Sequence, residues 1–170
     1  PLNAQGIDYA QLGRLIDWQI DAGIDALVIC GTTGESSTLT DKEHREAISF
    51  AVERTAGRGP VIAGTGSNDT AYAIDLTRFA CEAGADACLV VTPYYNKATQ
   101  KGLVAMYNAI ADASTKPLIL YNVPSRTGTA IHPATYLDLA HHPNIASITP
   151  PTAKNHAILH QHALVADPLV

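Results

Sequence analysis

Five short apolar runs recur along the chain, and they constrain its fold more than any other feature. They span residues 26–30, 61–63, 87–91, 118–121 and 145–148. Each run is continuously apolar rather than alternating, which is typical of parallel strands that are buried on both faces. The runs start about 30 residues apart, which is the size of one strand–helix unit. The chain is therefore predicted to be an α/β protein with a parallel sheet.

The segments between the runs carry helix signals. Asp8 with Gln11, and Thr40 with Glu43, have the spacing of capping boxes at helix starts. Pro133 fits the first position of a later helix. Strands that alternate with helices in this way build either an open doubly wound sheet or a (β/α)8 barrel, and periodicity alone does not separate the two.

The residues directly after the apolar runs favour the barrel. Small or reactive residues stand at the carboxyl ends of successive strands, whereas an open sheet gathers its ligand at one switch point. A complete (β/α)8 TIM barrel needs about 250 residues, and this chain of 170 residues shows five strand–helix units. We expect residues 1–148 to form a partial barrel that lacks its first strand, and residues 149–170 to form a tail.

Composition narrows the range of partners. The 11 basic and 16 acidic residues give a net charge of −5 without a basic cluster, which argues against nucleic acid. No apolar run approaches the roughly 18 residues of a membrane span, and the first residues lack the pattern of a signal peptide, so we expect a cytoplasmic protein. The three cysteines and seven histidines lack metal-ligand spacing. We therefore expect neither a metal nor a cofactor.

Two groups of residues at strand ends suggest a binding site for a small anion. The glycines of residues 31–36 (GTTGES) would let backbone N–H groups approach a carboxylate or phosphate, and Thr32 and Thr33 add hydroxyl donors. A tight turn that needs glycine is the alternative. Arg126 could hold a carboxylate as a fork, or could be a solvated surface charge. Tyr121 could relay protons, or could belong to the core.

Four motifs in order resemble the dihydrodipicolinate synthase family of pyruvate-dependent, Schiff-base-forming aldolases. They are GTTGES at 31–36, GTGSN at 64–68, VTPYYN at 91–96 and YNVPSRTG at 121–128. The resemblance covers about residues 7–148. It implies a (β/α)8 barrel that condenses pyruvate with aspartate 4-semialdehyde to 4-hydroxy-tetrahydrodipicolinate, a lyase step of lysine and diaminopimelate biosynthesis, in a dimer of dimers. It also implies that no cofactor is used.

The resemblance also assigns roles to individual residues. Thr32 and Thr33 match the positions that hold the pyruvate carboxylate and join a proton relay. Tyr121 matches the tyrosine that shuttles protons, and Tyr95 matches the one lent by the neighbouring subunit. Arg126 matches the residue that grips the carboxylate of the semialdehyde, which favours this branch over the related sialic-acid lyases.

A possible regulatory site for lysine is implied as well. Its matching positions are Ser36, Ser37, His44, Asn68 and Tyr94. Two further positions depart from the family pattern. Tyr72 stands where lysine-sensitive relatives carry an acidic residue, and Asp41 stands where some carry histidine.

The largest departure lies at the sixth strand of the family. A lysine there forms the imine with pyruvate, but this chain has Thr149 at that position. Only an amine condenses with a ketone, so Thr149 cannot form a Schiff base. Three explanations remain open: an altered reading frame in the tail of an ordinary enzyme, a shortened or deliberately altered chain, or an inactive relative. Three functions also stay open, namely this synthase, a module that binds keto acids without turnover, and another pyruvate aldolase with a different acceptor.

Overall fold

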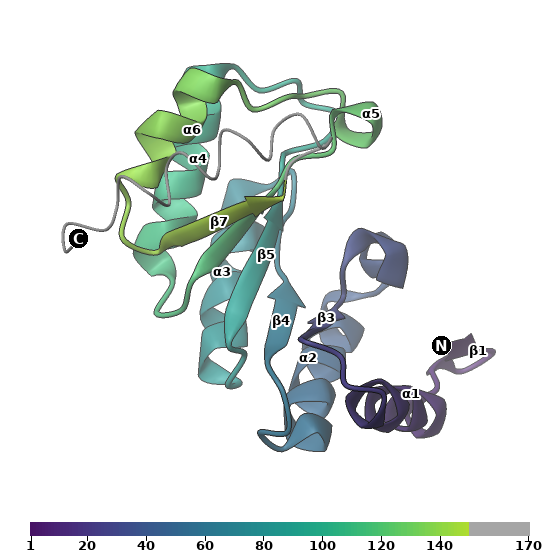
Figure 1. The fold of residues 1–170 in the computed structure, drawn as a ribbon. Helices are drawn as coiled ribbons and strands as arrows, with labels where there is room; N and C mark the ends of the chain where they lie inside the picture. The colour runs from purple at the N-terminus through teal and green to yellow at the C-terminus, as the bar shows by residue number, and fades with distance from the viewer. Residues whose placement is uncertain (150–170) are drawn as a thin grey trace, which may run out of the picture.

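A five-stranded parallel sheet forms the centre of the computed structural model, which describes residues 1–149 (Figure 1). Its strands are β3 (Leu27–Ile29), β4 (Val61–Gly64), β5 (Ala87–Val91), β6 (Leu118–Tyr121) and β7 (Ile145–Thr149). All five coincide with the predicted runs to within two residues at either end.

The order of the strands decides between the two architectures. They neighbour one another in chain order, β3-β4-β5-β6-β7, and each pair is parallel. A doubly wound sheet reverses its strand order at a switch point, and this sheet does not. Sequential parallel strands with intervening helices are the units of a (β/α)8 barrel, so the predicted fold class is confirmed.

Helices α2, α3, α4 and α6 lie along one side of the sheet (Figure 1). The α-helices are α1 (Tyr9–Asp21), α2 (Asp41–Thr55), α3 (Thr70–Glu82), α4 (Gln100–Ala113), α5 (Pro124–Thr127) and α6 (Pro133–Ala140). Two 3-10 turns, η1 (Thr32–Gly34) and η2 (Ser36–Thr38), come after β3. A small antiparallel hairpin of β1 (Leu2–Asn3) and β2 (Gly6–Ile7) precedes α1.

The helix starts agree with the sequence signals. Asp8 accepts a hydrogen bond from the backbone N–H of Gln11 at 2.9 Å. Thr40 and Glu43 form the complete capping box at the start of α2. Pro133 occupies the first turn of α6. These local bonds fix where each helix begins, and therefore how long the loop is that precedes it.

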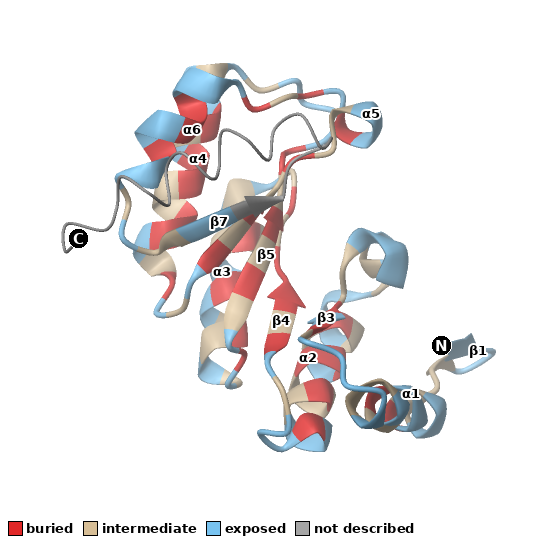
Figure 2. Ribbon diagram, in the orientation of Figure 1, coloured by how far each residue is buried: buried red, intermediate tan, exposed pale blue. Residues whose placement is uncertain are grey.

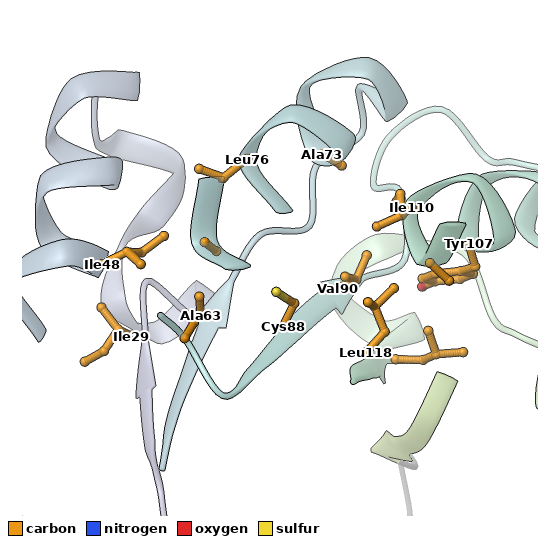
Figure 3. Packing of buried hydrophobic residues seen from close by; sticks show 14 of the residues in the cluster. Ile29, Ile48, Ala63, Ala73, Leu76, Cys88, Val90, Tyr107, Ile110 and Leu118 are labelled. Carbon is orange, nitrogen blue, oxygen red and sulfur yellow. The ribbon is translucent and has the colours of Figure 1, made fainter. Parts of the chain in front are cut away.

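The hydrophobic core lies between the sheet and the helices. Figure 3 shows Ile29, Ala63 and Val90 from the strands facing Ile48 and Leu76 of the helices. The expectation that the strands are buried on both faces is wrong for residues 1–149. Alternate strand residues point away from the helices, and Val28 among them is 50% exposed. The helices cover only one face, and the other face of the described sheet remains partly open (Figure 2).

The predicted domain boundary lies at the edge of the described residues. Of the predicted five strand–helix units, residues 1–148 carry four, β3–α2, β4–α3, β5–α4 and β6–α6, together with most of the fifth strand, β7. Of the predicted tail, residues 149–170, only Thr149 is described, as the last residue of β7 beside Tyr121. The other residues of that tail lie outside the described part of the chain.

Candidate functional site

A cavity of about 380 Å³ opens at the carboxyl ends of the strands. Its walls come from the loops after β3, β4, β5 and β6, together with the first turns of α2 and α3. The carboxyl end of a (β/α)8 barrel is where such loops build ligand sites. The lining residues are Thr32, Ser36, Ser37, Leu39, Asp41, His44, Gly66, Ser67, Tyr72, Val91, Tyr94, Tyr121, Val123, Arg126 and Thr127.

Seven of the ten predicted site residues therefore share one cavity. They are Thr32, Ser36, Ser37, His44, Tyr94, Tyr121 and Arg126. Three do not line it. Thr33 lines a neighbouring hollow of about 220 Å³ beside Pro1 and Leu2, the Tyr95 side chain is 90% exposed, and Asn68 is partly buried next to the lining residue Ser67.

The separation of Thr32 from Thr33 results from the local backbone. Both residues belong to the 3-10 turn η1. With about three residues per turn, consecutive side chains point roughly 120° apart. Thr32 therefore lines the cavity and Thr33 lines the neighbouring hollow, and a shared role of both hydroxyls at one ligand stays a prediction.

The backbone of the two flanking loops is strained. In the described part of the chain, residues 1–149, five non-glycine residues have positive φ, and four of them lie in the loops at this end of the sheet. Cys30 (56°) and Glu35 (58°) flank η1, while Tyr95 (70°) and Lys97 (49°) come after β5. Such conformations cost roughly 1–3 kcal/mol each and concentrate at ligand sites. The strained residues therefore lie at the same edge of the sheet as the cavity.

Arg126 is presented by the short helix α5, which begins with Pro124 and ends at Gly128 in the left-handed conformation (φ 69°). Its side chain reaches the cavity wall. Among residues 1–149, ion pairs are formed by Lys42, Arg45, Arg54 and Arg58, and His142 contacts Asp112, but none of these interactions involves Arg126. An unpaired guanidinium on a cavity wall favours a ligand that carries a carboxylate or phosphate.

A hydrogen-bond network, buried at Thr92 and exposed at His132, holds the loop that carries Arg126 and the segment that follows it. Thr92 Oγ1 donates to Thr127 Oγ1 at 3.1 Å. Gln100 donates to the Ala130 carbonyl at 2.8 Å and accepts from the His132 backbone N–H at 3.0 Å. Sequence reasoning missed this network, because its members are single polar residues without a recognisable spacing. The buried polar residues that come directly after strands, such as Thr92, were the available signal.

His44 forms the floor of the cavity on the α2 side. It is 6% exposed, and its Nε2 lies 2.8 Å from the carbonyl oxygen of Gly64. Burial lowers the pKa of His44, and the Arg45 charge lowers it too, against the opposing effects of the Gly64 hydrogen bond and the Asp41 charge. A neutral imidazole that donates from Nε2 is the state that this geometry supports.

Asp41 and Tyr72 meet at the entrance. Hydrogen bonds from Arg45, at 2.9 and 3.0 Å to the two carboxylate oxygens, lower the pKa of Asp41. The Tyr72 hydroxyl also donates to this carboxylate, and burial together with that bond raises the pKa of Tyr72 to about 12. The only carboxylate among the lining residues of the described chain is therefore already satisfied by Arg45 and Tyr72.

The cavity contains no amine among the described residues. Its lining includes no lysine, and Lys42 and Lys101 line grooves elsewhere. Backbone register places Thr149 next to Tyr121, at the edge of the cavity. Within residues 1–149, no group of three or more His, Cys, Asp or Glu could hold a metal ion. No helix in that part of the chain is long and apolar enough to cross a membrane.

Comparison with known proteins gives one consistent result. Residues 1–169 match the dihydrodipicolinate synthetase family. A 4-hydroxy-tetrahydrodipicolinate synthase from Thermoanaerobacter sp. (strain X514) is 57% identical over 142 residues, which are 84% of this chain and 48% of that protein. The chain spans about half the length of the curated relatives that it matches.

Two solved structures extend the likeness to the fold. The chloride-inhibited dihydrodipicolinate synthase from Acinetobacter baumannii, complexed with pyruvate, has a TM-score of 0.90 at 45% identity. The match covers 95% of this chain and 57% of the Acinetobacter baumannii chain. The enzyme from Cyanidioschyzon merolae with lysine bound has a TM-score of 0.89 at 38% identity. That match covers 94% of this chain and 55% of the Cyanidioschyzon merolae chain.

Proposed function

Because this chain belongs to the dihydrodipicolinate synthetase family, we propose that its cavity is the part of a 4-hydroxy-tetrahydrodipicolinate synthase site that binds pyruvate and aspartate 4-semialdehyde, the two substrates of the condensation to 4-hydroxy-tetrahydrodipicolinate. This is a lyase step of lysine and diaminopimelate biosynthesis, and we place it in the cytoplasm. The observation that carries the proposal is Arg126, which forms no ion pair within residues 1–149, on the wall of a cavity that is also lined by Thr32 and Tyr121. Both proposed substrates carry a carboxylate, which a guanidinium and hydroxyl groups bind well.

The proposed roles divide between the two substrates, pyruvate and aspartate semialdehyde. Thr32 offers its hydroxyl to the pyruvate carboxylate, with Thr33 next to it in η1. Arg126 grips the carboxylate of the semialdehyde from the opposite loop. Tyr121, at the end of β6 between these two groups, moves protons to and from the bound substrate. All of these groups position substrate and transfer protons.

The covalent step requires an amine. An amine condenses with the ketone of pyruvate, and loss of a methyl proton then gives an enamine that attacks the semialdehyde. The described cavity offers no amine, and Thr149 occupies the place beside Tyr121 where the resemblance puts the reactive lysine. We therefore propose that the chain as it stands binds the keto acid without turning it over.

Binding and the role of Arg126 can be tested by calorimetric titration. Pyruvate should bind the chain and its Arg126→Ala variant within about twofold. The same variant should lose about 10- to 100-fold in affinity for aspartate semialdehyde, because a charge-assisted hydrogen bond contributes roughly 1.5–3 kcal/mol. Arg78→Ala is the matched control, since Arg78 is exposed on α3 and does not line the cavity. A folded chain that binds no pyruvate would contradict the proposal.

Lysine is the effector to test at the Tyr72 end of the cavity. A lysine-bound relative supports this effector class, but Asp41 is already engaged by Arg45 and Tyr72. We therefore propose that lysine binds weakly, because its ammonium finds no free carboxylate. Tyr72→Glu should tighten lysine binding by at least about tenfold in the same calorimeter, whereas equal affinity of both proteins would contradict this reading.

A second copy of the chain completes the proposed site. Tyr95 is an aromatic residue that is 90% exposed and held at a φ of 70°. Strain and exposure of this kind are costly without a contact to offset them. We propose that Tyr95 reaches the cavity of a neighbouring copy, in a dimer of dimers. Sedimentation of the wild-type chain and of Tyr95→Ala, which should associate less tightly, tests this contact.

A further inference from the structure

The loop that carries Arg126 is closed at its base by the side chain of one residue. Asn122 directly follows β6, and its Oδ1 accepts a hydrogen bond from the backbone N–H of Ile131 at 3.3 Å. Its Nδ2 donates to the hydroxyl of Tyr136 on α6. All three residues are buried. One amide therefore joins both ends of the loop, residues 122–131, to helix α6, and we call Asn122, Ile131 and Tyr136 the loop base.

The side chain of Asn122 points away from the cavity. Successive residues of an extended chain point to opposite sides, and the burial pattern of β6 continues to alternate past its last residue. Tyr121 and Val123, on either side of Asn122, line the cavity. Asn122 does not line it and instead reaches Tyr136. Asn122 therefore acts on a ligand in the cavity through the loop and not by direct contact.

Helix α5, which presents Arg126, depends on the closure of this loop. It has only four residues, which is too short for a helix to be stable by itself. The Arg126 backbone N–H donates to the Val123 carbonyl at 2.9 Å. Thr127 Oγ1 lies 3.2 Å from the Val123 carbonyl oxygen and 3.0 Å from that of Thr129. Figure 1 shows α5 projecting beyond the ends of the strands, so these bonds connect Arg126 to the loop base.

We propose that Asn122 and Tyr136 are positioning residues that hold the loop so that the Arg126 guanidinium stays at the cavity wall for the carboxylate of the second substrate. The identity of that substrate rests on the proposed function, and the closure of the loop rests on the hydrogen bonds of Asn122. A loop that is already ordered loses less conformational entropy when its ligand binds. The pair should therefore raise the affinity for aspartate semialdehyde and leave the affinity for pyruvate, which we place at Thr32, unchanged.

A second buried tyrosine provides a matched control. Tyr107 lies on α4, which packs against α6, and it is fully buried. Its hydroxyl has no hydrogen-bond partner among residues 1–149. Replacing either tyrosine by phenylalanine removes one buried hydroxyl and keeps the ring, but only Tyr136→Phe breaks a hydrogen bond of the loop base. A difference between the two variants therefore reports that bond and not the loss of a hydroxyl from the core.

Calorimetric titration of the wild-type chain and both variants, with each substrate separately, tests the proposal. Tyr136→Phe should lose about three- to tenfold in affinity for aspartate semialdehyde, the size expected of one neutral hydrogen bond. It should bind pyruvate within about twofold of the wild-type chain, and Tyr107→Phe should bind both substrates within the same range. Equal losses for both substrates in Tyr136→Phe, or unchanged binding of the semialdehyde, would overturn the proposal, because a merely structural hydroxyl does not distinguish the two substrates.

Amide hydrogen exchange tests the closure of the loop without any substrate. Mass spectrometry of peptides that span residues 122–132 should show exchange about tenfold or more faster in Tyr136→Phe than in the wild-type chain or in Tyr107→Phe. Unchanged exchange would overturn the inference whatever the chain binds. A wild-type chain that binds no semialdehyde, but whose loop exchanges faster in Tyr136→Phe, would contradict the proposed function and confirm the closure of the loop.

Asn122→Ala is the second variant, because it removes both hydrogen bonds of the amide. Its loss of affinity for the semialdehyde should be at least as large as that of Tyr136→Phe, again with pyruvate within about twofold. Circular dichroism establishes that each variant is folded, and Tyr136→Phe decides the question if Asn122→Ala does not fold. A folded Asn122→Ala chain that loses pyruvate as strongly as the semialdehyde would show that Asn122 supports the whole cavity and not the loop of Arg126.

Discussion

His44 couples the candidate cavity to the stability of the fold. Its ring is buried and bonded to the Gly64 carbonyl, and burial lowers its pKa below that of the unfolded chain. The unfolded state therefore binds the proton more readily. The contribution of His44 to the free energy of unfolding should therefore be fully present above its unfolded pKa of about 6.5. This contribution should be lost as the pH falls from that value toward the lower folded pKa.

Urea midpoints at pH 7.5 and at progressively lower pH measure this effect. The wild-type chain should weaken over that range more than His44→Gln, which keeps a donor for Gly64 but has no titrating ring. Carboxylates other than Asp41 contribute equally to both proteins, so the difference between the two curves reports His44 together with its coupling to Asp41. Parallel curves would show that His44 does not titrate on unfolding.

At this scale, the residues at strand ends predicted Thr32, Tyr121 and Arg126 as site residues, whereas the other predicted residues that line the cavity, Ser36, Ser37, His44 and Tyr94, followed only from the family resemblance. The sequence did not separate Thr32 from Thr33, since the 3-10 geometry of η1 decides which hydroxyl faces the cavity. It also missed Gln100 and Thr92, whose roles depend on contacts with residues about 30 or more positions away.

At the scale of elements, glycine controls how closely neighbouring strands approach. A Cβ built on Gly64 would lie 2.1 Å from the Cys30 carbonyl oxygen, and one on Gly66 would lie 2.3 Å from the Val91 nitrogen. Both obstacles are backbone atoms that cannot rotate away. The GTGSN motif therefore brings β3, β4 and β5 together at the cavity edge, which is a structural reason for its glycines.

Gly64→Ala should consequently destabilise the chain by roughly 2–4 kcal/mol, because the backbone of two strands has to move. Chemical denaturation measures the change. Gly59→Ala is the matched control: it meets nothing within 4 Å and should shift the free energy of unfolding by no more than about 0.5 kcal/mol. A similar loss in the free energy of unfolding for Gly64→Ala and Gly59→Ala would contradict the explanation that Gly64 is needed for the close approach of the strands.

The positions of the strands and the capped helix starts were predictable, because continuous apolar runs and capping residues are local signals. The choice of barrel was predictable from the small and reactive residues at the strand ends and from the family resemblance, and the strand order settled it. The burial of both strand faces was not realised in residues 1–149. The sequence of a run such as residues 26–30 shows that both faces of the strand are apolar. Whether each face is buried depends on which other parts of the molecule pack against it.

At the scale of the whole molecule, one apolar face of the sheet is only partly covered by the described residues, 1–149. Val28 is 50% exposed, and Ile62, Leu89 and Ile119 are only partly buried beside it. Contiguous apolar surface of this kind drives association in water. We expect the 170-residue chain to self-associate as its concentration rises, and not to persist as a stable monomer.

Val28→Lys should reduce that association, because it places a charge in the middle of the uncovered face. Sedimentation velocity over a tenfold or larger range of concentration, roughly 1–100 μM, measures the change. Leu137→Lys is the control, since Leu137 is 41% exposed on the outer helix α6. An equal effect of both substitutions would mean that general solubility, not the sheet face, governs association.

The central claim is that the cavity is a keto-acid site that lacks only its reactive amine. Borohydride reduction in the presence of pyruvate, read by intact mass and peptide mapping, tests it most directly. The wild-type chain should gain no adduct, and Thr149→Lys should gain about 72 Da on residue 149, the mass of a reduced pyruvate imine. An adduct on another lysine of the wild-type chain, or none on a folded Thr149→Lys variant that binds pyruvate, would contradict the claim.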